Sequence, residues 1–406
     1  MKDTFRSLGN RNYRAYALGA LISNVGTWMQ RTAQDWIVLT ELTRNNATAL
    51  GIVMALQFGP QVALLPLTGY AADHLDRRKL LIFTQCAMGL LALGLGLLTL
   101  LGVIRLWHVY LFALLLGCVS AFDAPARQTF VTDLVGEADL ANAVALNSTS
   151  FNAARLIGPA LAGVLIGLIG SGWVFVANAA SYVAVLAALS ALKLDPHALV
   201  HAHHKRGSLA DGFRYIGARP DIRAALAMFF LIGTFGINYP IFISTMSVTV
   251  FHAGASQFGL LTSLMALGSV GGALLAAGRK NAGIGALLLP ATVFGAGFLC
   301  AAVAPTYGWF GLTLIIVGIA AQTFTTTANS TVQLATEPAM RGRVIAILFA
   351  IALGGTPVGA PIVGWVADRF GPRWAIVVGA ASGFGAALIA LDYLKKHRVA
   401  SAAQAP

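Results

Sequence analysis

The sequence predicts an all-α polytopic membrane protein, with twelve transmembrane helices in two pseudo-symmetric six-helix halves. Of its 406 residues, 57% are hydrophobic and only 10% are charged, whereas soluble domains carry about 25% charged residues. Apolar stretches of roughly 18 to 28 residues recur along the chain, each long enough to cross a hydrocarbon core. Lysine and arginine also gather in alternate loops, which is typical of multi-pass membrane proteins.

Twelve apolar stretches are expected to span the membrane. They cover residues 13–40, 48–72, 79–103, 107–127, 140–169, 173–193, 223–250, 256–278, 283–304, 308–332, 342–366 and 374–394. The first is too long and too polar in its middle for a cleavable signal peptide, so we expect it to stay in the mature protein.

The positive charge indicates topology. Numbered from a cytoplasmic N-terminus, the inside segments hold 21 of the 27 lysines and arginines, while the outside loops hold only Arg44, Arg105, Arg369 and Arg373. This asymmetry predicts that both termini and the long central loop of this multi-pass, inner-membrane protein lie in the cytoplasm. The net charge of +12 then reflects topology and contact with anionic lipid, and no nucleic-acid partner is expected.

An internal repeat predicts the two halves. A shift of 201 positions matches Gly117 with Gly318, Gly158 with Gly359, Gly163 with Gly364 and Trp173 with Trp374. At a slightly larger shift, Ala47, Thr48 and Gly51 match Ala255, Ser256 and Gly259. We expect an N-terminal half at 1–193, a cytoplasmic linker at 194–222, a C-terminal half at 223–395 and a cytoplasmic tail at 396–406.

The linker is hydrophilic and contains four histidines: His197, His201, His203 and His204. No carboxylate or cysteine completes a metal site with them, so a solvated linker is favoured over a metal site. Apolar residues among basic ones at 209–222 predict an interfacial helix on the cytoplasmic surface. We expect no metal and no cofactor.

In the loop after the second span, Gly69 is followed four residues later by Asp73 and then by the basic run that begins at Arg77. This loop resembles the signature loop of the major facilitator superfamily. Gly158, Pro159 and Gly163 resemble the antiporter motif of the exporters in that superfamily. These motifs, with the stretches 26–31 and 123–128, resemble the bacterial exporter branch that includes enterobactin exporters. The usual second glycine of the loop is missing near Asp76, and the second half lacks the aspartate.

The resemblance implies a conformational latch made of Gly69, Asp73, Arg77 and Asp123. Gly69 would allow close helix packing, and Asp73 would meet the N-terminal dipole of the eleventh span. Arg77 would pair with Asp123 at the end of the fourth span. The alternative is that these residues are ordinary loop charges of the positive-inside pattern.

Polar residues inside the spans predict a water-filled cavity near the bilayer midplane. On the first span, Asn24, Trp28, Arg31 and Asp35 recur every three or four residues, which places them on one helical face. The other candidate cavity residues are Gln57, Gln61, Asn152, Arg155, Asn238, Tyr239, Gln322, Thr326 and Asn329. Hydrogen bonding between helices is the alternative for the uncharged ones. The charged ones must be paired or hydrated, because each would otherwise cost about 2.5 to 3.5 kcal/mol.

Asp35 and Arg31 are the candidates for proton coupling. Four residues apart on a helix, they can touch, and the neighbouring cation would tune protonation of the carboxylate. A static ion pair is the alternative, and Asp123 and Glu41 are the other possible proton carriers.

These observations, with the resemblance, favour a monomeric, proton-coupled exporter of a small amphiphilic molecule such as a siderophore or drug, working by alternating access. Uptake rather than export, or a receptor or scaffold without transport, are the alternatives. An enzyme is disfavoured because all eight histidines fall in loops or at span ends. No phosphate-binding Gly-rich loop occurs, so direct use of ATP is not expected.

Overall fold

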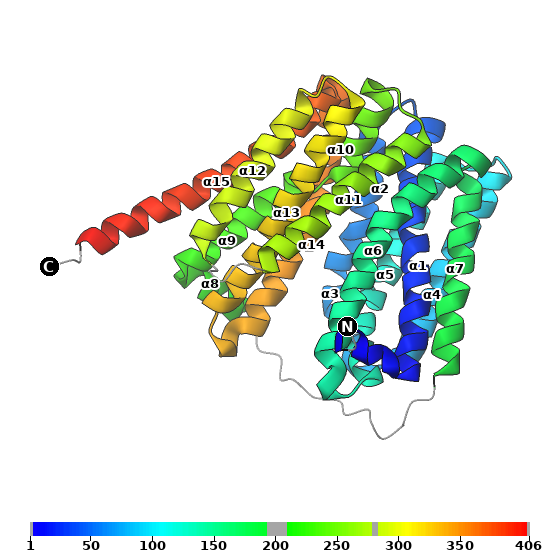
Figure 1. Cartoon of the computed structure of the whole chain (residues 1–406), viewed down its shortest axis with the longest axis horizontal. Helices are drawn as coiled ribbons and strands as arrows, with labels where there is room; N and C mark the ends of the chain where they lie inside the picture. The colour runs from blue at the N-terminus through cyan, green and yellow to red at the C-terminus, as the bar shows by residue number, and fades with distance from the viewer. Residues whose placement is uncertain (1–2, 193–208, 278–282, 404–406) are drawn as a thin grey trace. The chain divides into compact units, whose positions relative to one another are not determined.

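The computed structural model describes residues 3–192, 209–277 and 283–403, and these residues are nearly all helical (Figure 1). The helices of the first part of the chain are η1 (Asp3–Gly9), α1 (Arg11–Ile37), η2 (Val38–Leu42), α2 (Ala47–Ala63), α3 (Leu65–His74), α4 (Arg77–Leu100), α5 (Leu106–Leu134), α6 (Glu137–Ile169) and α7 (Ser171–Ala191). The remainder are α8 (Leu209–Ala218), α9 (Pro220–Leu231), η4 (Ile232–Gly236), α10 (Tyr239–Thr245), η5 (Met246–Val250), α11 (Ala255–Ala277), α12 (Ile284–Ala302), α13 (Tyr307–Ala335), α14 (Pro338–Phe370) and α15 (Pro372–Ala403).

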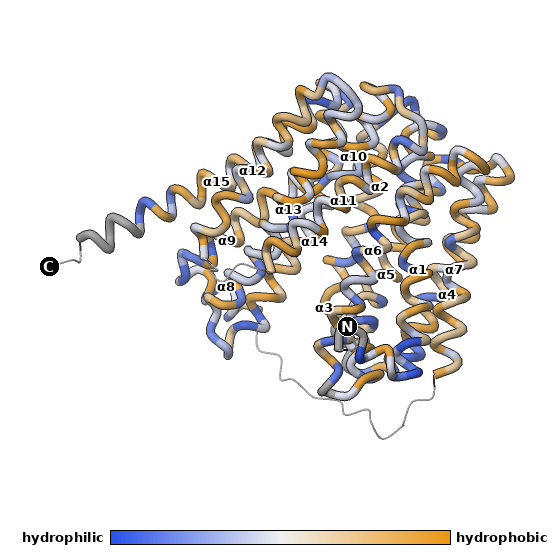
Figure 2. Tube along the Cα trace, viewed as in Figure 1, coloured by the Kyte–Doolittle hydropathy of each residue, from blue (hydrophilic) through white to orange (hydrophobic). Residues whose placement is uncertain are grey.

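In its described residues, each of the twelve expected stretches is mostly helical. Ten segments within the described part of the chain are long and apolar enough to cross a membrane. Helices α1 and α2 are not among the ten: α1 contains too many polar residues along its length, and α2 has only 17 residues. Figure 2 shows hydrophobic residues along most helices and hydrophilic residues concentrated towards many helix ends. The chain is a multi-pass membrane protein, and the count of twelve spans stays a prediction.

Two expected spans are interrupted. The second is divided between α2 and α3 at Leu64, and Pro66 stands in the first turn of α3. The seventh is divided among α9, η4, α10 and η5, with Pro240 at the start of α10. Proline lacks the backbone N–H that an uninterrupted helix would use for a hydrogen bond. Its ring also clashes with the carbonyl group four residues earlier. Apolar length alone does not reveal such breaks.

Several helices extend beyond their expected ends. Helices α6 and α14 have 33 residues each, α15 has 32, and α5 and α13 have 29. At 1.5 Å per residue, a 33-residue helix is about 50 Å long and exceeds a hydrocarbon core of about 30 Å by several turns. The expected spans were shorter because polar residues in those extra turns lower the hydrophobicity but do not end a helix.

The described chain forms two compact units. Unit 1 contains Met1–Asn45, Leu56–His204 and Ala253–Ser263, and unit 2 contains Asn46–Ala55, Lys205–His252 and Leu264–Pro406. Helix α2 therefore starts in unit 2 and continues in unit 1, whereas α11 starts in unit 1 and continues in unit 2. The predicted boundaries at 193 and 223 lie on either side of the largest undescribed segment.

In unit 2, a helix, α8, lies within the expected linker and ends four residues before the expected end at 222. Its place on the cytoplasmic membrane surface stays a prediction. The rest of the linker, with its four histidines, lies outside the described residues. Gly212 of α8 packs against Ile347 and Arg343 of α14. Just after α8, Arg219 donates to Asp221, 2.8 Å away, and to the carbonyl of Ala335. The hydrogen bond to Asp221 is the main cause of the raised pKa of Arg219. These contacts fasten α8 to unit 2.

An arginine beside the turn between α14 and α15 binds the end of α12 in the same unit. Gly371 adopts φ +101° there, a left-handed conformation that favours glycine. Arg373 donates to the carbonyl oxygens of Ala302 and Ala304, at 2.6 and 3.0 Å, at the C-terminal end of α12. A cation at this end is stabilised by the helix dipole.

Candidate functional site

A half-buried arginine of unit 1 lies against two aromatic rings. The guanidinium carbon of Arg31 on α1 is 5.1 Å from the ring centre of Trp28 and 5.5 Å from that of Phe58 on α2. Such contacts stabilise a cation by about 0.5 to 2 kcal/mol. The Nε of Arg31 is buried and has no hydrogen-bond partner among the described residues. The guanidinium therefore retains a donor for a further molecule.

Gln57 provides a second unpaired donor. Its side chain is buried, and its Nε2 has no partner within the described part of the chain. It precedes Phe58, whose ring contacts Arg31. One turn later, Gln61 donates to the backbone carbonyl of Gln57 at 3.4 Å, so Gln61 stays tied to its own helix. Buried donors without acceptors are costly, which favours a site that another polar molecule completes.

Helix α6 holds Trp28 in place. The rings of Trp28 and Phe151 make an edge-to-face contact, with centres 5.8 Å apart. A methyl group placed on Gly158 would lie 2.6 Å from Cβ of Trp28, too close for any larger residue without displacement. Pro159 follows within α6. In unit 1, the antiporter-like motif thus sets the distance between α6 and the Trp28 ring that Arg31 contacts.

Asp35 does not form the expected contact with Arg31. Of the ion pairs within 4.0 Å among the described residues, none joins these two side chains. The order arginine before aspartate is the less favourable one on a helix, and the guanidinium lies against the rings instead. The static ion pair considered from the sequence is therefore absent from this structure.

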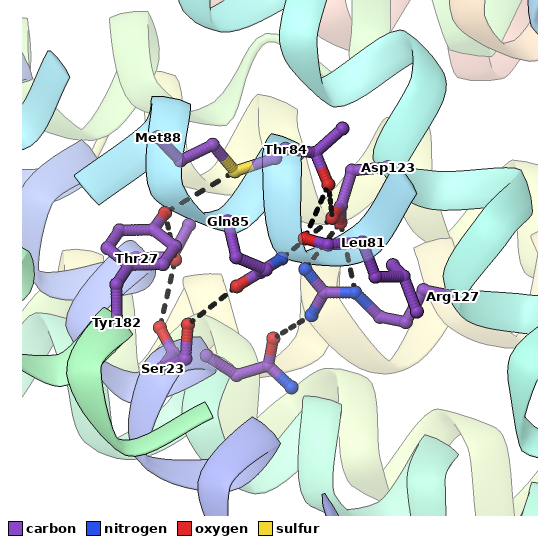
Figure 3. Close-up of polar contacts among 10 residues, drawn as sticks. Ser23, Thr27, Leu81, Thr84, Gln85, Met88, Asp123, Arg127 and Tyr182 are labelled. Atoms are coloured by element: carbon purple, nitrogen blue, oxygen red, sulfur yellow. Dashed lines mark hydrogen bonds and ion pairs between the residues drawn. The ribbon is translucent and has the colours of Figure 1, made fainter. Parts of the chain in front are cut away.

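Asp123 is the centre of a buried polar network (Figure 3). It is 3% exposed, and its carboxylate accepts hydrogen bonds from Thr84 at 2.8 Å, Gln85 at 2.7 Å and Arg127 at 2.5 and 3.0 Å. Arg127 also donates to Oδ1 of Asn24, 2.9 Å away. Buried charges persist only when paired and hydrogen-bonded in this way. The network joins α1, α4 and α5 within unit 1.

The network continues towards α7. Ser23 donates to Gln85 at 3.5 Å, while the hydroxyls of Thr27 and Tyr182 lie 3.2 Å apart. Tyr182 also donates to the sulfur of Met88 at 3.5 Å, and Figure 3 shows Met88 beside Tyr182. Asn24, expected to line a cavity, is instead buried and bound to Arg127.

The expected pairing of Arg77 with Asp123 is wrong. Arg77 binds Asp133, at 2.8 and 3.1 Å, and Asp123 binds Arg127. Helices α4 and α5 are neighbours, and because Thr84 on α4 contacts Asp123, the earlier Arg77 reaches a later residue of α5. On a helix, an acid four residues before a base forms a favourable pair. The spacing of Asp123 and Arg127 was therefore the feature of the sequence that could have predicted this pair.

Several other cavity candidates bond to residues four positions away in their own stretch of chain. The side-chain amides of Asn152, Asn238 and Asn329 each donate to a backbone carbonyl four residues earlier, at 2.9, 2.7 and 3.0 Å. Gln322 donates to Thr326 at 3.3 Å. Asn238 is 0% exposed, so it does not line an open cavity in this structure. These bonds are local, and none of them is a hydrogen bond between helices, which was the alternative for the uncharged residues.

The remaining candidates are placed as follows. Arg155 and Tyr239 are half-buried, on α6 and at the start of α10. Gly69 and Asp73 lie in α3, but their side-chain surroundings fall outside the described residues, so their role in a latch stays a prediction. In the parts of the chain that are described, no group of three or more metal-ligating side chains occurs.

Sequence comparisons place the chain among known transporters. The profile of the transmembrane secretion effector family matches residues 3–406. The staphyloferrin A transporter of Staphylococcus aureus is 27% identical over 351 residues, which cover 86% of this chain and 87% of that relative. The enterobactin exporter EntS of Shigella flexneri is 25% identical over 387 residues, covering 93% and 89%.

Solved structures show the same fold. The nucleoside transporter NupG superposes with a TM-score of 0.75 at 14% identity, over 95% of this chain and 99% of its own. A bacterial homologue of the human lysosomal transporter Spinster superposes with a TM-score of 0.74 at 17% identity, over 93% and 95%. With its helical architecture and its family match over nearly the whole length, the chain belongs to the transmembrane secretion effector family of the major facilitator superfamily.

Proposed function

We propose that this protein is a secondary active transporter that exports a small amphiphilic anion, of the siderophore or drug type, by alternating access. The observation that carries the proposal is Arg31, held between Trp28 and Phe58 with an unpaired Nε. A cation between aromatic faces suits a ligand with a negative charge and an apolar or aromatic body. The two curated relatives, a staphyloferrin A transporter and an enterobactin exporter, support a siderophore.

The test is counterflow in proteoliposomes, with enterobactin and staphyloferrin A as probes. We expect exchange of at least one probe by the wild type. Removal of the cation in Arg31→Gln should weaken that exchange by about tenfold to a hundredfold, since a charge-assisted hydrogen bond contributes about 1.5 to 3 kcal/mol.

The matched control is Arg44→Gln, which removes an exposed arginine from the turn before α2 and should leave exchange unchanged. Binding of a probe without counterflow would favour a receptor or scaffold. Accumulation driven inward by an imposed gradient would favour uptake. Equal exchange by the wild type and Arg31→Gln would refute the assignment of the site.

We further propose coupling to protons through Asp35. Among the described residues, Asp35 forms no ion pair within 4.0 Å. A carboxylate inside a span that is not held in such a pair can change its protonation during transport, which supports this role. The transporter would work as a monomer in the bacterial inner membrane, with lipid, protons and substrate as its partners.

The proposed topology predicts that both termini are cytoplasmic. A reporter that is active only in the cytoplasm should be active after Pro406, and one that is active only in the periplasm should be active near Asn45. The reason is the segregation of lysine and arginine between alternate loops. Enzymatic activity of each fusion is the measurement, and the reverse pattern would contradict the twelve-span arrangement.

A further inference from the structure

Helix α15 of unit 2 presents an exposed stripe with a tryptophan at one end and a lysine at the other. The stripe recurs every seven residues and consists of Trp374, Ala381, Leu388 and Lys395, all exposed. Residues seven apart lie on nearly the same face of an α-helix. From end to end the stripe is about 32 Å long, close to the thickness of about 30 Å of a hydrocarbon core. A tryptophan and a lysine at opposite ends are typical of a helix that faces lipid.

Helix α9 of the same unit packs against α15 and has a stripe of its own. Apart from its first residue, the exposed residues of α9 are Arg223, Ala227 and Phe230, at steps of four and three. This spacing places them on one face of the helix. The stripe of α9 therefore also has a cation at one end, followed by small and apolar residues.

The two cations lie at the same end of unit 2. Tyr393 on α15 is close enough to Asp221, in the first turn of α9, to interact with its charge. Lys395 follows Tyr393 by two positions, and Arg223 follows Asp221 by two positions. Because both side chains are long, they can reach a common ligand at this end.

Both cations are without a partner among the described residues. Neither Arg223 nor Lys395 forms an ion pair or a hydrogen bond through its side chain there. The carboxylates of the same two helices are already used: Asp221 pairs with Arg219 and Asp392 with Lys396, each at 2.8 Å. Two adjacent cations of this kind favour an anion from outside the chain.

The apolar surface behind the cations favours a phospholipid over a soluble anion. A lipid phosphate has oxygens that suit both the guanidinium fork of Arg223 and the ammonium of Lys395. Leu388 is 65% exposed and Phe230 is 48% exposed, on the stripes that continue from these cations. Acyl chains would cover both side chains, whereas a soluble phosphate would gain nothing from them.

We propose that the adjoining ends of α9 and α15 bind an anionic phospholipid, whose phosphate contacts Arg223 and Lys395 and whose acyl chains lie along the two exposed stripes. Basic residues between transmembrane helices are a general means of recognising anionic headgroups. Under the proposed topology this end is cytoplasmic, so the lipid belongs to the inner leaflet. The inference goes beyond the proposed transport and requires neither its substrate nor its direction.

The experiment measures lipid binding to the full-length protein in detergent by native mass spectrometry. The probes are phosphatidylglycerol, which is anionic, and phosphatidylcholine, which is zwitterionic. The wild type should prefer phosphatidylglycerol. The double variant Arg223→Gln with Lys395→Gln should bind phosphatidylglycerol about tenfold to thirtyfold more weakly, with unchanged binding of phosphatidylcholine. Replacement by Lys395→Arg, which retains the charge, should preserve the preference.

The matched control is the double variant Arg44→Gln with Arg105→Gln. It removes the same charge from two exposed positions in loops that are expected on the other side of the membrane. Charges so distant are screened, so the affinity for phosphatidylglycerol should change by less than about twofold. Equal losses in the two double variants would show that binding follows net charge alone, and would overturn the site.

Two further results would assign the surface to another occupant. Glycerol 3-phosphate, which has the phosphate but no acyl chains, should not displace phosphatidylglycerol at equal concentration. Displacement would show that the site takes a soluble phosphate ester. A wild-type dimer that the Arg223 and Lys395 double variant loses would show that a second copy covers this face. Either result would overturn the inference, whereas a wild type that transports neither siderophore would count against the proposed function alone.

Discussion

Replacement of Asp123 by alanine is expected to destabilise the protein by about 3 to 5 kcal/mol, the typical loss when one partner of a buried ion pair is removed. Arg127 would keep its charge without a counterion, and Thr84 and Gln85 would lose their acceptor. The measurement is unfolding of the purified protein in detergent, followed by tryptophan fluorescence.

Two comparisons make that prediction specific. The double variant Asp123→Asn with Arg127→Gln removes both charges and should recover much of the loss, because no unpaired charge remains. The matched control is Asp392→Ala, which breaks the exposed pair with Lys396 and should change stability by about 0.5 kcal/mol or less. Equal losses for Asp123→Ala and Asp392→Ala would show that the network contributes no more than a surface pair.

Asp35→Asn is expected to abolish uphill, gradient-driven efflux while substrate binding and downhill exchange persist. The neutral amide imitates the protonated carboxyl permanently, so the protein could change conformation but could not release a proton. The measurement is accumulation of probe in everted vesicles with an imposed pH gradient, beside counterflow without one.

Glu41→Gln is the matched control for charge loss, because Glu41 lies exposed just beyond α1 and accepts a hydrogen bond from Ser171. It should retain uphill efflux. Should Asp35→Asn still concentrate the probe with the pH dependence of the wild type, the coupling carboxylate lies elsewhere.

The positions of the helices could be predicted from the sequence because apolar length is a local property. The partners of charged residues could not. Two carboxylates of α5, Asp123 and Asp133, were possible partners for Arg77. The offset between α4 and α5 in the structure brings Arg77 to Asp133. The same limit applies to Asn24, whose place on the face of Arg31 was evident while its bond to Arg127 was not.

The internal repeat had a meaning that the sequence did not disclose. Gly163 and Gly364 were recognised as repeat partners, as were Thr48 and Ser256. In the structure, Gly364 packs against Thr48, and Gly163 against Ser256. The glycine repeat (Gly163 and Gly364) and the hydroxyl repeat (Thr48 and Ser256) are therefore the two sides of one kind of contact. Similarity along the chain does not reveal that these two repeats pack against each other.

The segment from Asp368 to Arg373, around the turn between α14 and α15, is expected to tolerate substitutions better than insertions or deletions. Five positions separate two anchored charges: Asp368 accepts from the backbone N–H of Ala47 at the start of α2, and Arg373 binds the last carbonyls of α12. Gly371 between them needs its left-handed backbone. One inserted or deleted residue would rotate at least one charge away from its helix end. Over evolutionary time, this turn should vary in the identity of its exposed residues and hold its length, while connections without such anchors gain and lose residues freely.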